Sequence, residues 1–240
     1  MLAQAGYGSR RACEIMIAAG RVRVNGEVAV LGQKADLTVD RVTLDGTAVS
    51  GPDRPTYVAL YKPRRVLSAV ETHDSRPTVR DLVPLSGHLY PVGRLDFDSE
   101  GLILLTNDGE LTNLLTHPRF GHEKEYRVLL ARRPDEEQLA TWRRGVMLEE
   151  GGRTAPAEVR FETTAGRGAW IRVTMGEGRK RQIREVGRLL GLPVVRIIRV
   201  RIGSLRLGSL KPRQWRHLSA DEVKELKGKN SVRTAGSQKP

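Results

Sequence analysis

Two kinds of periodicity follow one another in the first fifty residues. In GSRRACEIMIAAG the apolar positions recur every three or four residues, which predicts a helix with Ser9 as its N-cap and the last glycine as its stop. The next segment, RVRVNGEVAV, alternates apolar and polar residues around Asn25-Gly26, a pair typical of tight hairpins. A further alternating run, TVDRVTLDG, completes a helix-plus-hairpin module that we expect to span residues 1–50.

The pattern changes after a short linker, which we assign to residues 51–56 because glycine and proline in SGPDRP break any periodicity. Strands are then predicted at TYVALYKP, RVLSAV, HLYPVG, LILLT, EKEYRVLLA, APAEVRFE and AWIRVTM. Helices are predicted at GELTNLLTH with Asp108 as cap, at DEEQLATWRR with Pro134 at the first position, and at RKRQIREVGRLL. The fold class is therefore α+β, with residues 57–227 on a mixed or antiparallel sheet with flanking helices.

The C-terminal end carries one more helical signal. Ser219 and Glu222 have the spacing of a capping box, which predicts a last short helix. The segment after it is polar and basic and has no apolar periodicity, so residues 228–240 are expected to form a disordered tail.

Composition narrows the class of protein. The chain has 240 residues and 39% hydrophobic content, enough for a sizeable core, and no apolar run approaches the length of a spanning helix. It has neither a secretory signal at its start nor a second cysteine to pair with Cys13, and we therefore expect a cytoplasmic protein without disulfides or a cysteine-based zinc site.

Charge suggests a partner. The formal net charge is +13, and twelve basic residues against two acidic ones lie between Gly176 and His217. Without a hydrophobic anchor beside this run, nucleic acid is the better match than a membrane surface, although a solvated charged face is the plain alternative.

An acidic cluster interrupts this basic chain. In GRLDFDSEGLILLTNDGEL three carboxylates, Asp96, Asp98 and Glu100, occupy alternate positions. A calcium loop needs a bidentate ligand at its twelfth position, where this chain has Asn107. A glycosidase pair requires two facing carboxylates, which sequence neighbours alone do not establish, and a polar turn between strands remains the simplest reading from the residues.

Longer motifs resemble known families. GSRRACEIMIAAGRVRVNGEV resembles the core of the S4 RNA-binding domain, and GRLDFDSEGLILLTNDGEL resembles the signature of the RsuA/RluB-type pseudouridine synthases nearly letter for letter. KEYRV, GEGRKRQIRE and RIGSLRLGSLKPRQWRHL resemble the later motifs of that family in the same order. The resemblance reaches to about Lys227 and implies an S4-like module followed by a pseudouridine synthase-like catalytic domain.

The resemblance also implies site residues. Asp96 would be the catalytic carboxylate, Tyr126 the ring that packs on the target base, and Arg184 the basic side chain that tunes Asp96. Asp98 and Glu100 would shape the loop, and Leu205 or Leu207 would form an apolar wall beneath the base. The candidate RNA-binding residues are Arg10, Arg11, Arg21, Arg94, Arg179, Lys180, Arg181 and Arg188.

The implied function is isomerisation of uridine to pseudouridine in ribosomal RNA. The large subunit is the expected target, and the small subunit the alternative. The reaction neither loses nor gains atoms, so no cofactor or metal is expected, and the partner would be ribosomal RNA or a pre-ribosomal particle, bound by a monomer. A catalytically silent S4-containing assembly factor is the rival interpretation.

Overall fold

The computed structural model describes residues 1–3, 5–51, 54–72 and 74–228. Nearly all of the predicted C-terminal tail, and part of the predicted linker, lie outside these residues. No helix in the described part of the chain is long and apolar enough to cross a membrane.

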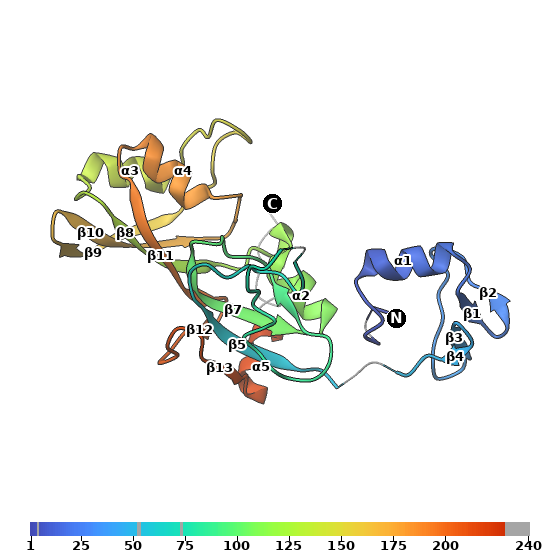
Figure 1. Ribbon diagram of the computed structural model, residues 1–240. Coiled ribbons are helices and arrows are strands. Elements are labelled where there is room, and N and C mark those ends of the chain that lie inside the picture. The colour runs from blue at the N-terminus through green and yellow to red at the C-terminus, as the bar shows by residue number, and fades with distance from the viewer. Residues whose placement is uncertain (4, 52–53, 73, 229–240) are drawn as a thin grey trace, which may run out of the picture.

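The N-terminal module contains one helix and a small sheet (Figure 1). The Ser9 hydroxyl accepts a hydrogen bond from the amide of Ala12 at 3.1 Å, as the predicted N-cap requires. Asn25 and Gly26 both have positive φ, the geometry of the predicted hairpin turn. The sequence pattern missed a second hairpin, which turns at Asp45-Gly46. The elements are α1 (Arg10–Ala18), β1 (Val22–Val24), β2 (Glu27–Val28), β3 (Val42–Leu44) and β4 (Thr47–Ala48), in the sheet order β2-β1-β3-β4.

The second unit is built on one large mixed sheet, in the order β13-β5-β7-β11-β8-β10-β9. Its strands are β5 (Tyr57–Lys62), β6 (Tyr90–Val92), β7 (Glu100–Thr106), β8 (Lys124–Leu130), β9 (Glu158–Ala165), β10 (Gly168–Met175), β11 (Val194–Ile202), β12 (Leu205–Arg206) and β13 (Trp215–His217). The pairing of β7 with β11 is parallel, and the other named pairs are antiparallel, which confirms the predicted fold class. The predicted strand RVLSAV is wrong: that segment forms only one isolated bridge, at Leu67.

Helices cover the sheet and connect its strands (Figure 1). They are α2 (Gly109–Thr116), the 3-10 turn η1 (Pro118–Phe120), α3 (Glu136–Arg144), α4 (Gln182–Leu189) and α5 (Ala220–Gly228). Asp108 caps α2, and Ser219 with Glu222 forms the predicted box before α5. Pro134 is not at the first position of α3, because Asp135 forms a capping box with Gln138 and the helix begins after it.

The strands that carry the site are buried. All seven residues of β7 are buried, and its two faces contribute to different apolar clusters, one around Leu102 and Leu104 and the other around Ile103 and Leu105. A third cluster, around Val128 and Ile171, lies beneath α3 and α4. The loop that precedes β7 is therefore fixed to the best-packed strand of the domain.

Candidate active site

The loop between β6 and β7 carries Asp96. It closes on itself because the amide of Ser99 donates to the carbonyl oxygen of Asp96 at 3.0 Å. Ser68 also holds it from outside: the amide of Leu95 donates to the Ser68 hydroxyl oxygen at 3.0 Å, and that hydroxyl donates to the Leu95 carbonyl at 2.8 Å. These bonds restrict the backbone on both sides of Asp96 before any substrate arrives.

Two buried cations hold the same loop from within the protein. Lys62, at the end of β5, is 0% exposed, and its Nζ donates to the carbonyl oxygens of Ser99 at 2.7 Å and Pro63 at 3.0 Å. Arg199, on β11, donates to the carbonyls of Leu102 at 2.7 Å and Arg94 at 3.3 Å. Burial lowers the pKa of Lys62 to about 8, against the opposing effect of nearby carboxylates, Asp96 first. Neither residue was singled out from the sequence.

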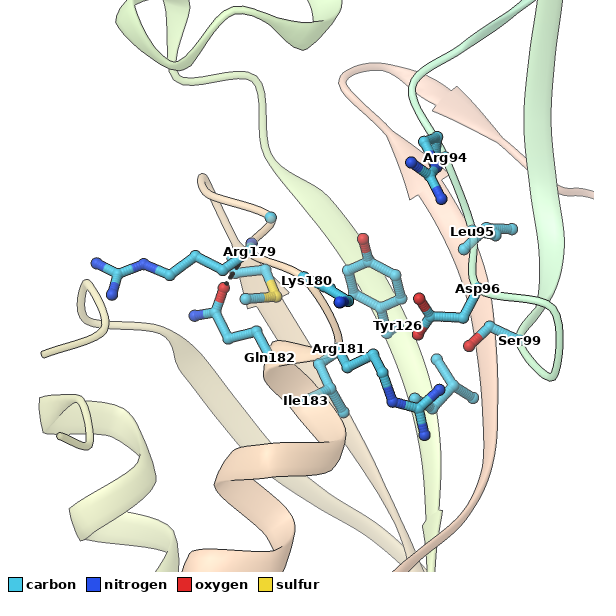
Figure 2. Close-up of a pocket in the computed structure, with 13 residues that line it drawn as sticks. Arg94, Leu95, Asp96, Ser99, Tyr126, Arg179, Lys180, Arg181, Gln182 and Ile183 are labelled. Carbon is cyan, nitrogen blue, oxygen red and sulfur yellow. Dashed lines mark hydrogen bonds between the residues drawn. The ribbon is translucent and has the colours of Figure 1, made fainter. Parts of the chain in front are cut away.

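A pocket of about 570 Å³ opens beside this loop (Figure 2). The carboxylate of Asp96 and the ring of Tyr126, from β8, both line it. Tyr126 is only 8% exposed, so its ring forms part of the wall of the pocket. The other lining residues are Arg94, Leu95, Ser99, Met175, Gly178, Arg179, Lys180, Arg181, Gln182, Ile183 and Ile197. The pocket thus combines one carboxylate and one aromatic ring with an apolar floor and a cationic edge.

The other two acids of the cluster lie elsewhere. Glu100 is 4% exposed and accepts two hydrogen bonds from the guanidinium of Arg196, at 2.6 and 2.9 Å. Asp98 lies in the turn that precedes β7, and its carbonyl oxygen accepts from Arg184 at 3.4 Å. Of the three carboxylates, only Asp96 lines the pocket.

Arg184 lies behind the Asp96 loop. Its guanidinium donates to the carbonyls of Val194 at 3.2 Å and Asp98 at 3.4 Å, and the pocket lining does not include it. Burial is the main cause that lowers the pKa of Arg184, and repulsion from Arg181 lowers it further. Attraction to Asp96 opposes both effects. Within the described residues Arg184 therefore supports the loop through backbone contacts, whereas its neighbour Arg181 lines the pocket.

The candidate RNA-binding residues fall into two groups, those available to a ligand and those already bound within the protein. Arg94, Lys180 and Arg181 line the pocket, and Arg10 and Arg11 are exposed on α1. The others have partners inside the protein: Arg21 pairs with Asp45, Arg188 pairs with Glu149, and Arg179 donates to the carbonyls of Gly151, Gly152 and Arg153. Although Arg179 borders the pocket, its guanidinium points away from Asp96 and holds the loop before β9 (Figure 2).

The expectation for Leu205 and Leu207 is wrong. Both side chains are buried in the apolar cluster that includes Ile202 and Leu226, and neither lines the pocket. The apolar lining comes instead from Leu95, Met175, Ile183 and Ile197. They lie far apart in the sequence, on the β6–β7 loop, β10, α4 and β11, and only the fold brings them together.

Comparison with known proteins agrees with this arrangement. A family model described as RNA pseudouridylate synthase matches residues 56–187, and an S4 domain model matches residues 1–36. The chain belongs to the RNA pseudouridylate synthase family, and it is an enzyme of that family.

Relatives and a solved structure match nearly the whole chain. An uncharacterized RNA pseudouridine synthase of Aquifex aeolicus is 39% identical over 94% of this chain and 91% of the relative. The ribosomal large subunit pseudouridine synthase B of Bacillus subtilis is 38% identical over 96% of this chain and 97% of its own length. A crystal structure of a pseudouridylate synthase, 29% identical, superposes with a TM-score of 0.68 over 94% of this chain and 96% of that chain.

Proposed function

We propose that this enzyme converts a uridine of large-subunit ribosomal RNA to pseudouridine, with Asp96 as the catalytic carboxylate. Similarity to large-subunit synthases supports this target: the chain is 38% identical to the Bacillus subtilis protein over 97% of that protein's length. The observation that carries the catalytic role is that Asp96 alone, among three neighbouring carboxylates, lines a pocket that also contains an aromatic ring.

The reaction requires one well-placed carboxylate. The bond from C1′ to N1 of uracil breaks, the base rotates, and a bond from C1′ to C5 forms, while the proton on C5 is lost and N1 gains one. Asp96 acts at the sugar during the break, either by attack or by proton removal. The loop contacts from Lys62, Arg199 and Ser68 keep that carboxylate in position.

The remaining residues bind the nucleotide. Tyr126 packs against the uracil ring, and the apolar lining removes water from around the rotating base. Arg184 positions the loop through the carbonyl of Asp98. Arg94, Lys180 and Arg181 contact phosphates, and the target base leaves its stack to enter the pocket. We assign residues 57–227 to catalysis and residues 1–50 to additional RNA affinity.

The test is chemical mapping of the product. Large-subunit and small-subunit RNA transcripts would be incubated with wild-type protein, Asp96→Asn or the matched control Asp98→Asn, then treated with carbodiimide and read by primer extension. We expect one new stop on large-subunit RNA with wild type and Asp98→Asn, and none with Asp96→Asn. A stop that persists with Asp96→Asn would overturn the role of Asp96. A stop only on small-subunit RNA would overturn the target, and tight binding without any stop would favour the assembly-factor interpretation.

A further inference from the structure

Backbone conformation singles out three arginines. Among the described residues, five that are not glycine have positive φ: Asn25, Asp45, Arg65, Arg181 and Arg213. Asn25 and Asp45 each precede a glycine in a hairpin turn, where short polar side chains tolerate this conformation. Arginine has no such local advantage, so each of the other three positions would accept glycine with less strain.

Backbone contacts and the pocket lining place these three arginines near the Asp96 loop or near its support, Lys62. The amide of Arg65 donates to the carbonyl of Phe97, the residue after Asp96, at 2.7 Å. Arg181 lines the pocket. The amide of Arg213 donates to the carbonyl of Tyr61 at 2.9 Å, at the end of β5 where Lys62 pairs with Gly101 at the start of β7. Arg65 therefore lies next to the Asp96 loop, Arg213 lies next to the end of β5, and Arg181 lies at the pocket.

Their side chains are also free. Arg65, Arg181 and Arg213 are exposed, and among the described residues none of the three guanidinium groups has a hydrogen bond or an ion pair. Arg21, Arg188 and Arg216, by contrast, each pair with a carboxylate. A free guanidinium offers the planar set of donors that matches a phosphate group.

We propose that Arg65 and Arg213, together with Arg181, form a phosphate-binding rim for the RNA strand on either side of the target uridine. An arginine is retained at each left-handed position because it supplies a cation for phosphate, which glycine cannot supply. Arg65, in the loop after β5, and Arg213, in the segment before β13, add two cations outside the pocket lining to this set. This inference rests on the proposed RNA substrate, and it does not require that Asp96 be catalytic.

The experiment compares three matched substitutions, Arg65→Gly, Arg213→Gly and Arg167→Gly. Arg167 is exposed and lies between β9 and β10, at the end of β10 opposite Met175 of the pocket, so it controls for the loss of one charge. Affinity for a large-subunit RNA transcript would be measured between 50 and 200 mM salt, together with the melting temperature. We expect each rim variant to lower the slope of log affinity against log salt by about 0.7 to 0.9, and Arg167→Gly to leave it unchanged.

Stability separates this role from a structural one. Glycine removes the strain at Arg65 and Arg213 but adds chain entropy, so we expect the melting temperature to stay near the wild-type value. Arg65→Lys should restore much of the slope. Wild-type slopes in both rim variants, an equal loss in Arg167→Gly, or a large drop in melting temperature would each overturn the proposal. RNA modification with unchanged slopes would refute the rim alone, and reduced slopes without modification would refute the proposed function alone.

Discussion

Two sets of cations lie near the Asp96 loop, and they differ in their hydrogen-bond partners. Lys62 and Arg199 are buried, 0% and 3% exposed, and both donate hydrogen bonds to backbone carbonyls. Arg65, Arg181 and Arg213 are exposed, and their guanidinium groups have no hydrogen-bond or ion-pair partner among the described residues. A buried charge must satisfy its hydrogen bonds within the protein, whereas an exposed one can exchange water for an anionic ligand. Burial therefore commits a cation to the fold, whereas an exposed cation without a partner in the protein remains available to the substrate.

The comparison implies that catalysis and RNA affinity are separable. The buried set fixes the backbone around the carboxylate, which affects the rate of the chemical step. The exposed set adds electrostatic affinity, which depends on salt and has little effect on the folded state. Substitutions in each set should therefore change different measurements.

The largest effect is expected where the loop enters the sheet. Gly101 has a φ of +106°, and a Cβ there would lie 2.3 Å from the carbonyl oxygen of Arg199. Gly101→Ala should lower the free energy of unfolding by about 3 kcal/mol in urea titrations, through strain and overpacking together. Gly152→Ala is the control, since that glycine also has positive φ but no atom within 4 Å of its Cβ position, and about 1 kcal/mol is expected. Equal losses of unfolding free energy in the two variants would mean that the close contact with Arg199 adds nothing to the cost of a side chain at position 101.

Removing the buried ammonium group should damage catalysis. Lys62→Met leaves the carbonyls of Ser99 and Pro63 without this donor, and the loop can then move away from its productive position. We expect kcat to fall about 100-fold, with RNA affinity changed by less than about twofold. Lys124→Met is the matched control, because Lys124 Nζ donates to the His122 carbonyl and not to the Asp96 loop. Unchanged kcat in Lys62→Met, or an equal fall in Lys124→Met, would contradict the positioning role.

Local sequence signals predicted helix caps and turns correctly, but they did not predict which distant segments pair. The Ser9 cap, the Asn25-Gly26 turn and the Ser219 box depend on residues within four positions, and the structure has all three. RVLSAV alternates like a strand but finds no extended partner, because pairing depends on segments far away in the chain.

The candidate site divides in the same way. Asp96 and Tyr126 belong to motifs, and both line one pocket although thirty residues separate them. Lys62 and Arg199 belong to strand segments that are largely apolar, in which a cation would normally be assigned to solvent. Only the strand order, which places β7 between β5 and β11, brings both cations against the loop. Leu205 and Leu207 failed as pocket residues for the same reason, since β12 pairs at the edge of β11 and faces another cluster.

The pH dependence of stability should report on the buried lysine. Its pKa is lowered from 10.5 to about 8 by burial, while Asp96, Glu100 and Asp98 oppose the shift and Arg199 adds to it. Between these two values the unfolded chain binds a proton that the folded protein does not, so this group adds stability as the pH rises. The free energy of unfolding of wild type relative to Lys62→Met should increase by about 1.5 kcal/mol from pH 8 to pH 9.5. A flat or falling difference would show that Lys62 titrates near its ordinary pKa.

The smallest effect is expected at an arginine that is exposed yet already paired. Arg188 donates to Glu149 at 2.5 Å, with side chains 58% and 69% exposed, so Arg188→Ala should change stability by less than about 0.5 kcal/mol. Because Glu149 competes with phosphate for this guanidinium, Arg188→Ala should reduce the salt slope of RNA binding less than Arg65→Gly does. Glu149→Gln should release Arg188 and raise RNA affinity slightly, and it should lose that effect in the Arg188→Ala background. An equal reduction of the slope in Arg188→Ala and in the rim variants would contradict this expectation. It would mean that an ion pair within the protein does not reduce the contribution of an exposed arginine to RNA binding.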